Sequence, residues 1–273
     1  PRKLRCIWQE PIKTDFRDAE MLARVAKMDP KLLRPIEHRS ADAQARLAIL
    51  QARDALVKSR TSLINHVRGT VKCAGERLPK CSAASFHKKA PEHIPSELKA
   101  ALLPLIEQIA NFTEGIKKYE HEVTHLSRTH YPETEVLRQV PGVGPITALA
   151  FVLTLEDKDR FTKSRDVGPF LGLVPKRDQS GDTDKQLRIT KCGNSQLRTL
   201  LVNVAHYVLG PFGADSELRR FGQRIAARGG TIAKKRAVVA VARKLAVLLH
   251  RLWVTGEEYH PFYCHKDSTV EAA

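Results

Sequence analysis

One run of apolar residues constrains the fold of this chain more than any other feature. Between Leu98 and Leu126 the apolar positions alternate at spacings of four and three, which is the heptad pattern of a coiled-coil helix. The positions are Leu98, Leu102, Leu105, Ile109, Phe112, Ile116, Tyr119, Val123 and Leu126. Pro104 and Gly115 interrupt the run, and we expect local kinks there. The pattern predicts a long helix, with Ser96 as its N-cap.

A second long helix is predicted from Ser40 to about Lys72, because apolar residues recur there every seven positions. One line holds Ile49, Leu56 and Leu63, and the adjacent line holds Leu50, Val57, Ile64 and Val71. A loop containing several prolines joins the two helices. Together they predict an antiparallel hairpin or a dimerisation stalk, through which the protein would form a homo-oligomer.

Three arginines share the seven-residue period of this second helix. Arg46, Arg53 and Arg60 fall between the two apolar lines on a helical projection. In one interpretation their stems lie along a partner helix while the charged heads reach water. In the other they face the backbone of a nucleic acid, and the pattern fits both.

The rest of the chain also reads as helical. A helix is predicted from Asp15 to Met28, with Thr14 or Asp15 near its N-terminus and Asp29-Pro30 at its end. Past Tyr131 the sequence consists of short apolar runs separated by glycine and proline. This change in composition predicts a domain boundary near Glu135. In that last domain, Asn194 is a good N-cap for one helix, and another runs from about Ile232 to Trp253. The fold class is mostly α.

Charge and cysteine content restrict the partners and the compartment. The chain has 46 Lys and Arg against 30 Asp and Glu, a formal net charge of +16 and a pI near 9.8. This excess predicts a polyanionic partner, with nucleic acid first. No apolar run approaches the ~18 residues that span a bilayer, so no membrane is expected. Five cysteines without a Cys-x-x-Cys pair suit a reducing compartment, and we expect a cytoplasmic protein.

The segment Val140-Pro141-Gly142-Val143-Gly144-Pro145 precedes an apolar helix and has the pattern of a helix-hairpin-helix turn. Gly142 and Gly144 would let the backbone approach a phosphate, which the N–H groups opening the helix could bind without reading sequence. The alternative is a tight turn packed inside the domain.

Ser180 lies before Gly181, in a loop crowded by cations. A serine hydroxyl attacks a phosphodiester where cations hold the phosphate and offset its developing charge. A serine-glycine pair can equally do no more than turn the chain, so the local sequence leaves both roles open. The cations that could clamp phosphate are Lys176, Arg177, Lys185, Arg188, Lys191 and Arg198.

Asp15 and Asp18 lie three residues apart, so a helix projects them from one face. Two such carboxylates are half of what two Mg²⁺ ions need for in-line attack on a phosphodiester. Acidic residues are also favoured near helix N-termini by the dipole alone. The pair by itself therefore does not decide between these explanations.

Taken in order, these segments resemble one family over most of the chain. The matching segments are Lys13-Thr14-Asp15-Phe16-Arg17-Asp18-Ala19, the helical stalk, Val140 to Pro145, Gly172-Leu173-Val174-Pro175 leading to Ser180-Gly181, and Ile189 to Arg198. This combination is similar to the bacterial insertion-sequence transposases often called the "one-ten" family. Members couple a ribonuclease H-like, resolvase-type domain bearing an Asp-Glu-Asp-Asp tetrad to a C-terminal transposase domain with a nucleophilic serine.

The resemblance assigns roles to individual residues. It implies that Asp15 and Asp18 are the third and fourth acids of the tetrad, that they bind Mg²⁺ in the intact enzyme, and that Ser180 is the nucleophile. It also implies as partners the DNA of the element ends and the target, and a structured guide RNA. We further expect nucleic-acid contacts from Gly142, Gly144, Lys176, Arg177, Arg188, Lys191 and Arg198.

The chain also departs from the family pattern. The first two acids of the tetrad belong to strands upstream of the third, yet only fourteen residues precede Asp15. We therefore expect an incomplete fragment, inactive alone, with residues 1–35 as the remnant of the resolvase-like domain. Residues 36–134 would be the coiled-coil linker, 135–262 the transposase domain and 263–273 a tail. The alternative function is a non-catalytic DNA- or RNA-binding remnant.

Overall fold

The computed structural model describes residues 14–33, 38–180 and 183–262. They divide between two compact units, Pro1–Ser40 and Ala41–Ala273, which are described separately. Helices account for most of the described residues, and the strands among them form a single two-stranded sheet. The expected fold class, mostly α, is therefore confirmed.

The first unit contains α1 (Asp15–Met28) and the short α2 (Pro30–Leu33). Thr14 caps α1, because its side-chain oxygen accepts a hydrogen bond from the backbone N–H of Arg17. The helix ends where Pro30 follows, since proline disfavours helical backbone at the residue before it. Both ends match the sequence prediction. Phe16 and Met28 are about four-fifths exposed, so α1 buries little of its apolar surface.

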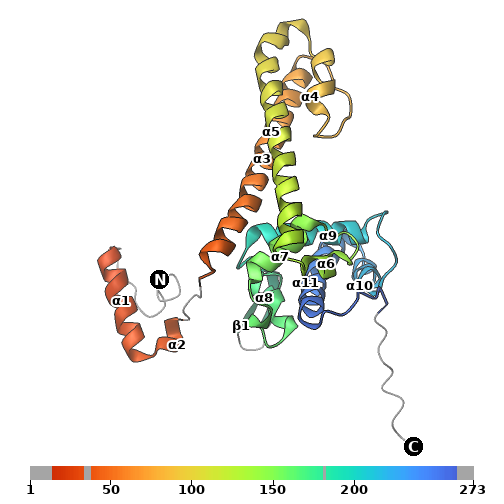
Figure 1. Cartoon of the computed structure of the whole chain (residues 1–273). Helices are drawn as coiled ribbons and strands as arrows, with labels where there is room; N and C mark the ends of the chain where they lie inside the picture. The colour runs from red at the N-terminus through yellow and green to blue at the C-terminus, as the bar shows by residue number, and fades with distance from the viewer. Residues whose placement is uncertain (1–13, 34–37, 181–182, 263–273) are drawn as a thin grey trace, which may run out of the picture. The chain divides into compact units, whose positions relative to one another are not determined.

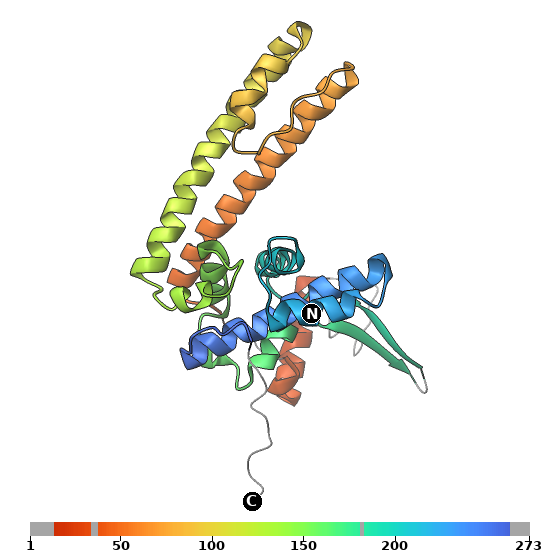
Figure 2. The same ribbon diagram turned by 90° about the vertical axis from the view of Figure 1, so that its right-hand side faces the viewer.

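The second unit begins with a helical hairpin made by α3 (Ala41–Cys73) and α5 (Ser96–Thr129) (Figures 1 and 2). The two helices run antiparallel, because Arg53 contacts Glu120 whereas the later Arg60 contacts the earlier Thr113. All nine residues of the predicted seam are buried or half-buried. The hairpin therefore covers its own apolar seam within one chain.

Two details of α5 differ from the prediction. The cap position is occupied by Pro95, and Ser96 is the first helical residue, with its hydroxyl donating to the Glu97 carboxylate. The helix also continues through Pro104 and Gly115. A Cβ at Gly115 would lie 3.0 Å from Leu56 Cδ1. The glycine thus serves close packing of α3 against α5, a role that the sequence pattern did not distinguish from a kink.

Two of the three heptad arginines contact the partner helix α5, and the third contacts Tyr131 just beyond the end of α5. Arg53 Nε donates to Glu120 Oε1 at 3.2 Å, and Arg60 Nη1 donates to Thr113 Oγ1 at 3.3 Å. Arg46 pairs with Asp42 and stacks on the ring of Tyr131, 5.0 Å from its centroid. These contacts favour the first interpretation, in which the arginines stabilise the hairpin.

At the far end of the hairpin, residues 74–95 fold back over the helices and include α4 (Phe86–Lys89) and the short 3-10 helix η2 (Pro91–His93). Phe86 is fully buried there. It belongs to a small core, which consists of Ile64, Val67, Val71, Phe86, Ala90, Ile94, Leu102, Ile106 and Ile109. The tip is thus packed independently of the larger core at the hairpin's base.

The remaining helices surround α7 (Pro145–Leu155), in which every residue from 147 to 155 is buried. Ala43, Leu47 and Leu50 of α3 belong to the same core as these helices. The base of the hairpin and the C-terminal helices therefore share one hydrophobic core. The other elements are α6 (Thr134–Arg138), η3 (Lys158–Arg160), η4 (Ser164–Asp166), α8 (Val167–Phe170), β1 (Pro175–Ser180), β2 (Thr183–Ile189), α9 (Ser195–Leu209), α10 (Glu217–Ala226) and α11 (Gly230–Thr255).

His250 of α11 is a buried polar residue with both ring nitrogens in hydrogen bonds. Nδ1 lies 2.9 Å from Ser164 Oγ, and Nε2 lies 3.0 Å from the Lys158 carbonyl oxygen. A neutral ring satisfies both contacts, with Nε2 donating and Nδ1 accepting. Burial lowers the pKa of His250 below its ordinary value, more strongly than the Lys158 carbonyl and Asp159 raise it.

This lowered pKa predicts a pH-dependent stability. Below about pH 6.5 the unfolded chain takes up a proton at His250 before the folded chain does. The free energy of unfolding should therefore decrease as the pH falls from 7.5 to 5.5. His250→Gln should lower stability by about 1–3 kcal/mol at pH 7.5 and flatten this dependence. Urea titrations of the parent and of His250→Gln between pH 5.5 and 7.5 measure the free energy of unfolding.

The control for this prediction is His87. Burial also lowers the pKa of His87, and nearby lysines lower it further. His87→Gln should leave the contribution of His250 in place. An unchanged pH dependence in His250→Gln would contradict the assignment.

Candidate active-site hairpin

Ser180 is the last residue of β1, in the antiparallel hairpin of β1 and β2. Its backbone pairs with Thr183, across a connection formed by residues 181–182, which lie outside the described part of the chain. Figure 2 shows the hairpin projecting away from the helices. The side chains of Ser180 and Lys185 also lie outside the description. The structure thus gives the position of Ser180 along the hairpin, and the orientation of its hydroxyl stays a prediction.

Two glycines allow the chain to close tightly at the base of this hairpin. Gly172 has a φ of +67° and Gly193 a φ of +72°. A Cβ at Gly172 would lie 2.3 Å from the backbone nitrogen of Cys192, and one at Gly193 would lie 2.1 Å from the Phe170 carbonyl oxygen. Neither position has room for a side chain. Close backbone contact therefore fixes where the two strands leave the helical core.

Arg198 of α9 holds the same base from one side. Its Nη1 donates to the carbonyl oxygens of Leu171 at 3.0 Å and Cys192 at 2.7 Å. The Lys191 N–H also donates to the Gly172 carbonyl at 3.2 Å. We predicted a nucleic-acid contact for Arg198, and the structure gives it hydrogen bonds that join the two chain segments at the base. Asn194 caps α9 as expected, because its side chain accepts from the Leu197 N–H.

The other predicted phosphate-binding residues near the hairpin are exposed where the structure describes their side chains. Lys176 and Arg177 are consecutive and exposed in β1, where the pairing with β2 has a register shift. Arg188 is exposed on β2, and Lys191 is exposed just beyond it, with a positive φ of 56°. Exposed cations therefore lie along both strands of the hairpin that carries Ser180.

The glycine-rich turn lies between α6 and α7. Gly142 has a φ of +89°, and a Cβ there would lie 2.6 Å from Tyr207 Cδ1, so the turn packs against the exposed ring of Tyr207. Gly144 occupies the cap position of α7. The Val143 N–H donates to the Val140 carbonyl at 3.0 Å, which closes the turn. A backbone contact to phosphate by Gly142 and Gly144 stays a prediction.

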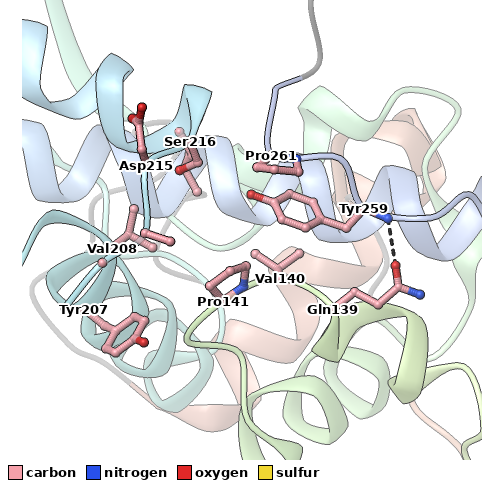
Figure 3. Close-up of a pocket in the computed structure, with 12 residues that line it drawn as sticks. Gln139, Val140, Pro141, Tyr207, Val208, Asp215, Ser216, Tyr259 and Pro261 are labelled. Carbon is pink, nitrogen blue, oxygen red and sulfur yellow. Dashed lines mark hydrogen bonds between the residues drawn. The ribbon is translucent and has the colours of Figure 1, made fainter.

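A cavity of about 290 Å³ lies beside this turn (Figure 3). Residues 259–261 cross over it, and the Tyr259 N–H donates to Gln139 Oε1 at 2.7 Å. The Pro261 carbonyl accepts from the Glu217 N–H at 2.9 Å, so the same segment also holds the start of α10. Sequence patterns did not reveal this cavity, because four separate segments form its walls.

Asp15 and Asp18 occupy the first turn of α1, as expected for a pair on one helix face. Asp15 is exposed and Asp18 is half-buried. Both belong to the first unit, whereas Ser180 belongs to the second. Within the described ranges, no three His, Cys, Asp or Glu side chains gather as a metal site would require. The pair could supply two carboxylates to Mg²⁺, but further ligands would have to come from elsewhere.

Comparison with known proteins identifies the family. Residues 134–221 match the family model described as "Transposase IS116/IS110/IS902 family". The chain is also 32% identical over 256 residues to the transposase for insertion sequence element IS1111A of Coxiella burnetii, which covers 90% of this chain and 68% of that protein. The chain belongs to the IS116/IS110/IS902 transposase family. The resemblance inferred from the sequence is thereby confirmed.

Other members of this transposase family align similarly. A putative transposase of Sinorhizobium fredii, y4pF/y4sB, is 29% identical over 90% of the chain and 64% of its own length. The transposase for insertion sequence element IS1328 of Yersinia enterocolitica is 30% identical over 71% of the chain and 58% of its own length. The chain thus spans about three-fifths to two-thirds of these relatives. None of its described helices has the length and apolar character needed to cross a membrane.

Proposed function

We propose that this chain acts on the DNA of a mobile insertion sequence, cutting and rejoining strands with Ser180 as the nucleophile. The observation that carries the proposal is the position of Ser180. It ends β1 within the family-matched region, on a hairpin whose base is held by Arg198 and close backbone contacts. A projecting hairpin with exposed cations can bring its tip to the backbone of an extended polyanion.

The proposed reaction conserves the energy of the phosphodiester. Ser180 Oγ loses its proton and attacks the phosphorus, and the bond from phosphorus to one deoxyribose oxygen breaks. The released oxygen takes up a proton, which leaves a serine–phosphate link to the other DNA end. The hydroxyl of a second strand then attacks that phosphorus and displaces Ser180, so no ATP is consumed. Lys176, Arg177, Arg188 and Lys191 would offset the charge on the phosphate oxygens.

Asp15 and Asp18 are the residues of this chain that would hold Mg²⁺, together with ligands from outside the described residues. A bound Mg²⁺ would lower the cost of ionising the serine hydroxyl and of charging the phosphate. We also propose that a structured guide RNA selects the DNA, and that the helical hairpin contributes to a homo-oligomer in which acids and serine come from different protomers.

The experiment that tests this function looks for a covalent intermediate. The protein is incubated with Mg²⁺ and labelled duplex DNA carrying the element ends, then denatured in detergent and separated by electrophoresis. DNA that stays attached to protein, with the link mapped by mass spectrometry to the peptide containing Ser180, is the expected result. A link mapped to another residue would contradict the proposal.

A second candidate function is nucleic-acid binding without catalysis. The net charge of +16 favours it, because such an excess of cations binds a phosphate backbone whether or not chemistry follows. Under this function no covalent product forms at any Mg²⁺ concentration, while binding weakens steeply with added salt. The two functions are separated by assaying the same DNA both for covalent product and, by fluorescence anisotropy, for binding: binding without any covalent product indicates the second.

A further inference from the structure

The region around α10 and α11 has an extreme charge composition. From Leu218 to Gly256 the sequence contains no Asp or Glu. Its cations are Arg219, Arg220, Arg224, Arg228, Lys234, Lys235, Arg236, Arg243, Lys244 and Arg251. A solvated helix face usually mixes both signs, so this one-sided composition calls for a partner of opposite charge.

The structure separates these cations into two groups. In the first group, Arg219 donates to backbone carbonyls, and Arg220, Lys244 and Arg251 pair with acids that lie outside the acid-free stretch. The second group is exposed, and none of its members has an acidic partner among the residues that the structure describes. It consists of Arg224, Arg228, Lys234, Lys235, Arg236 and Arg243. We call this second group the α10–α11 patch.

The patch follows the outer faces of two helices that meet at a sharp corner. Gly229 and Gly230, both with positive φ, form that corner. Arg224 lies in the last turn of α10, and Arg228 lies in the turn just after its end; both are exposed. On α11, Arg236 and Arg243 share a face with Ile232, whose side chain is 68% exposed. In Figure 2 this corner projects from the same side of the second unit as the β1–β2 hairpin.

The shape of the corner selects among polyanions. The first two turns of α11 bury little, since Ala233 and Ala237 are their buried residues. A projecting helix end of this kind fits the ~12 Å wide major groove of B-form DNA, with cations on both helices reaching phosphates at its edges. The major groove of A-form RNA is too narrow and deep to admit it. An exposed Ile232 among cations also suits a groove that presents thymine methyl groups.

We propose that the α10–α11 patch is a binding surface for duplex DNA, with the start of α11 in the major groove. The surface is distinct from the hairpin that carries Ser180. The proposal extends the proposed function, because it adds a DNA contact that takes no part in strand cleavage. Binding to the patch is measured without cleavage. A failure of the Ser180 proposal would therefore not contradict the patch, and a failure of the patch proposal would not contradict the role of Ser180.

The test compares two charge-matched variants in binding to a labelled DNA duplex of about 30 base pairs. One carries Lys234→Gln, Lys235→Gln and Arg236→Gln. The control carries Lys80→Gln, Lys99→Gln and Lys117→Gln, three exposed lysines of the helical hairpin and its tip. Each phosphate contact contributes about 0.9 to the slope of log affinity against log salt. For the patch variant, the magnitude of this slope should be smaller than the parent's by about 2–3. The variant should also bind about 10–100-fold more weakly at 150 mM KCl.

The control variant should bind within about threefold of the parent, because charges beyond a Debye length are screened. Both variants should unfold at the parent's temperature, since the substituted side chains are exposed. Equal binding by the two variants would overturn the proposal.

Two further measurements test which groove is bound and which nucleic acid is the partner. Methyl green, a major-groove ligand, should displace the protein, whereas netropsin in the minor groove should not. A duplex RNA of the same sequence that bound as well as the DNA would contradict the choice of DNA.

Discussion

Ser180→Ala is expected to reduce formation of the protein–DNA adduct and of joined strands by about 10⁴-fold or more. Removal of a covalent nucleophile leaves only the contribution of substrate binding and of charges around the phosphate. Binding itself should change by less than about threefold, because a single hydroxyl contributes little beside the cations of the hairpin and the α10–α11 patch. The measurement is adduct yield over time on labelled DNA, alongside anisotropy on the same duplex.

Ser195→Ala is the matched control. Ser195 is an exposed serine in the family-matched region, at the start of α9, where its backbone carbonyl accepts from Thr199 Oγ1. Its substitution removes one hydroxyl and keeps that hydrogen bond. Adduct formation should therefore persist in Ser195→Ala. Persistence in Ser180→Ala, or loss in both variants, would remove Ser180 from the proposed role.

Gly193→Ala is expected to lower the free energy of unfolding by about 3 kcal/mol or more. A residue with a side chain pays about 1–2 kcal/mol to adopt the left-handed backbone that Gly193 has. The new Cβ would also lie 2.1 Å from the Phe170 carbonyl oxygen, so the backbone at the base of the hairpin must shift. Chemical denaturation of the variant and the parent measures the loss.

The same substitution at Gly69 should have the opposite sign. Gly69 is an exposed position inside α3, and a Cβ there meets no atom within 4 Å. Alanine at such a position should stabilise the protein by about 0.5–1 kcal/mol, because it restricts the unfolded chain and suits a helix. Equal effects at Gly69 and Gly193 would show that neither backbone geometry nor close packing at the hairpin base controls stability.

The long helices could be predicted from the sequence because their signals are local. Thr14 before α1, Asn194 before α9 and the seven-residue period of α3 act within a few turns, so each survives any tertiary arrangement. The apolar seams predicted either an antiparallel hairpin or a dimerisation stalk, and the structure shows α3 packed on α5 within the chain. Gly115 shows the limit of such patterns. A glycine in a helix predicts a kink and a close approach equally well, and only the position of Leu56 distinguishes them.

The candidate site was predictable in part. The local sequence predicted a serine among cations, and the family resemblance predicted Ser180 as the nucleophile. The hydrogen bonds of Arg198, however, depend on two carbonyls, one of them 27 residues away along the chain. Local sequence contains no information about such a contact. The α10–α11 patch was also predictable only in part. Its charge is visible in the sequence, but the division between paired and exposed cations depends on the positions of Asp215 and Glu217 in the structure.

The antiparallel hairpin of α3 and α5 also restricts how this chain can vary in length. Each contact across it, such as Arg53 with Glu120, depends on both helices presenting the same faces at the same height. A deletion of a few residues in one helix would rotate its seam away from the partner. Removal of seven residues from each helix, which shortens the hairpin by about 10 Å, nearly preserves the facing surfaces. Natural variants of this hairpin should therefore differ in length by paired steps of seven.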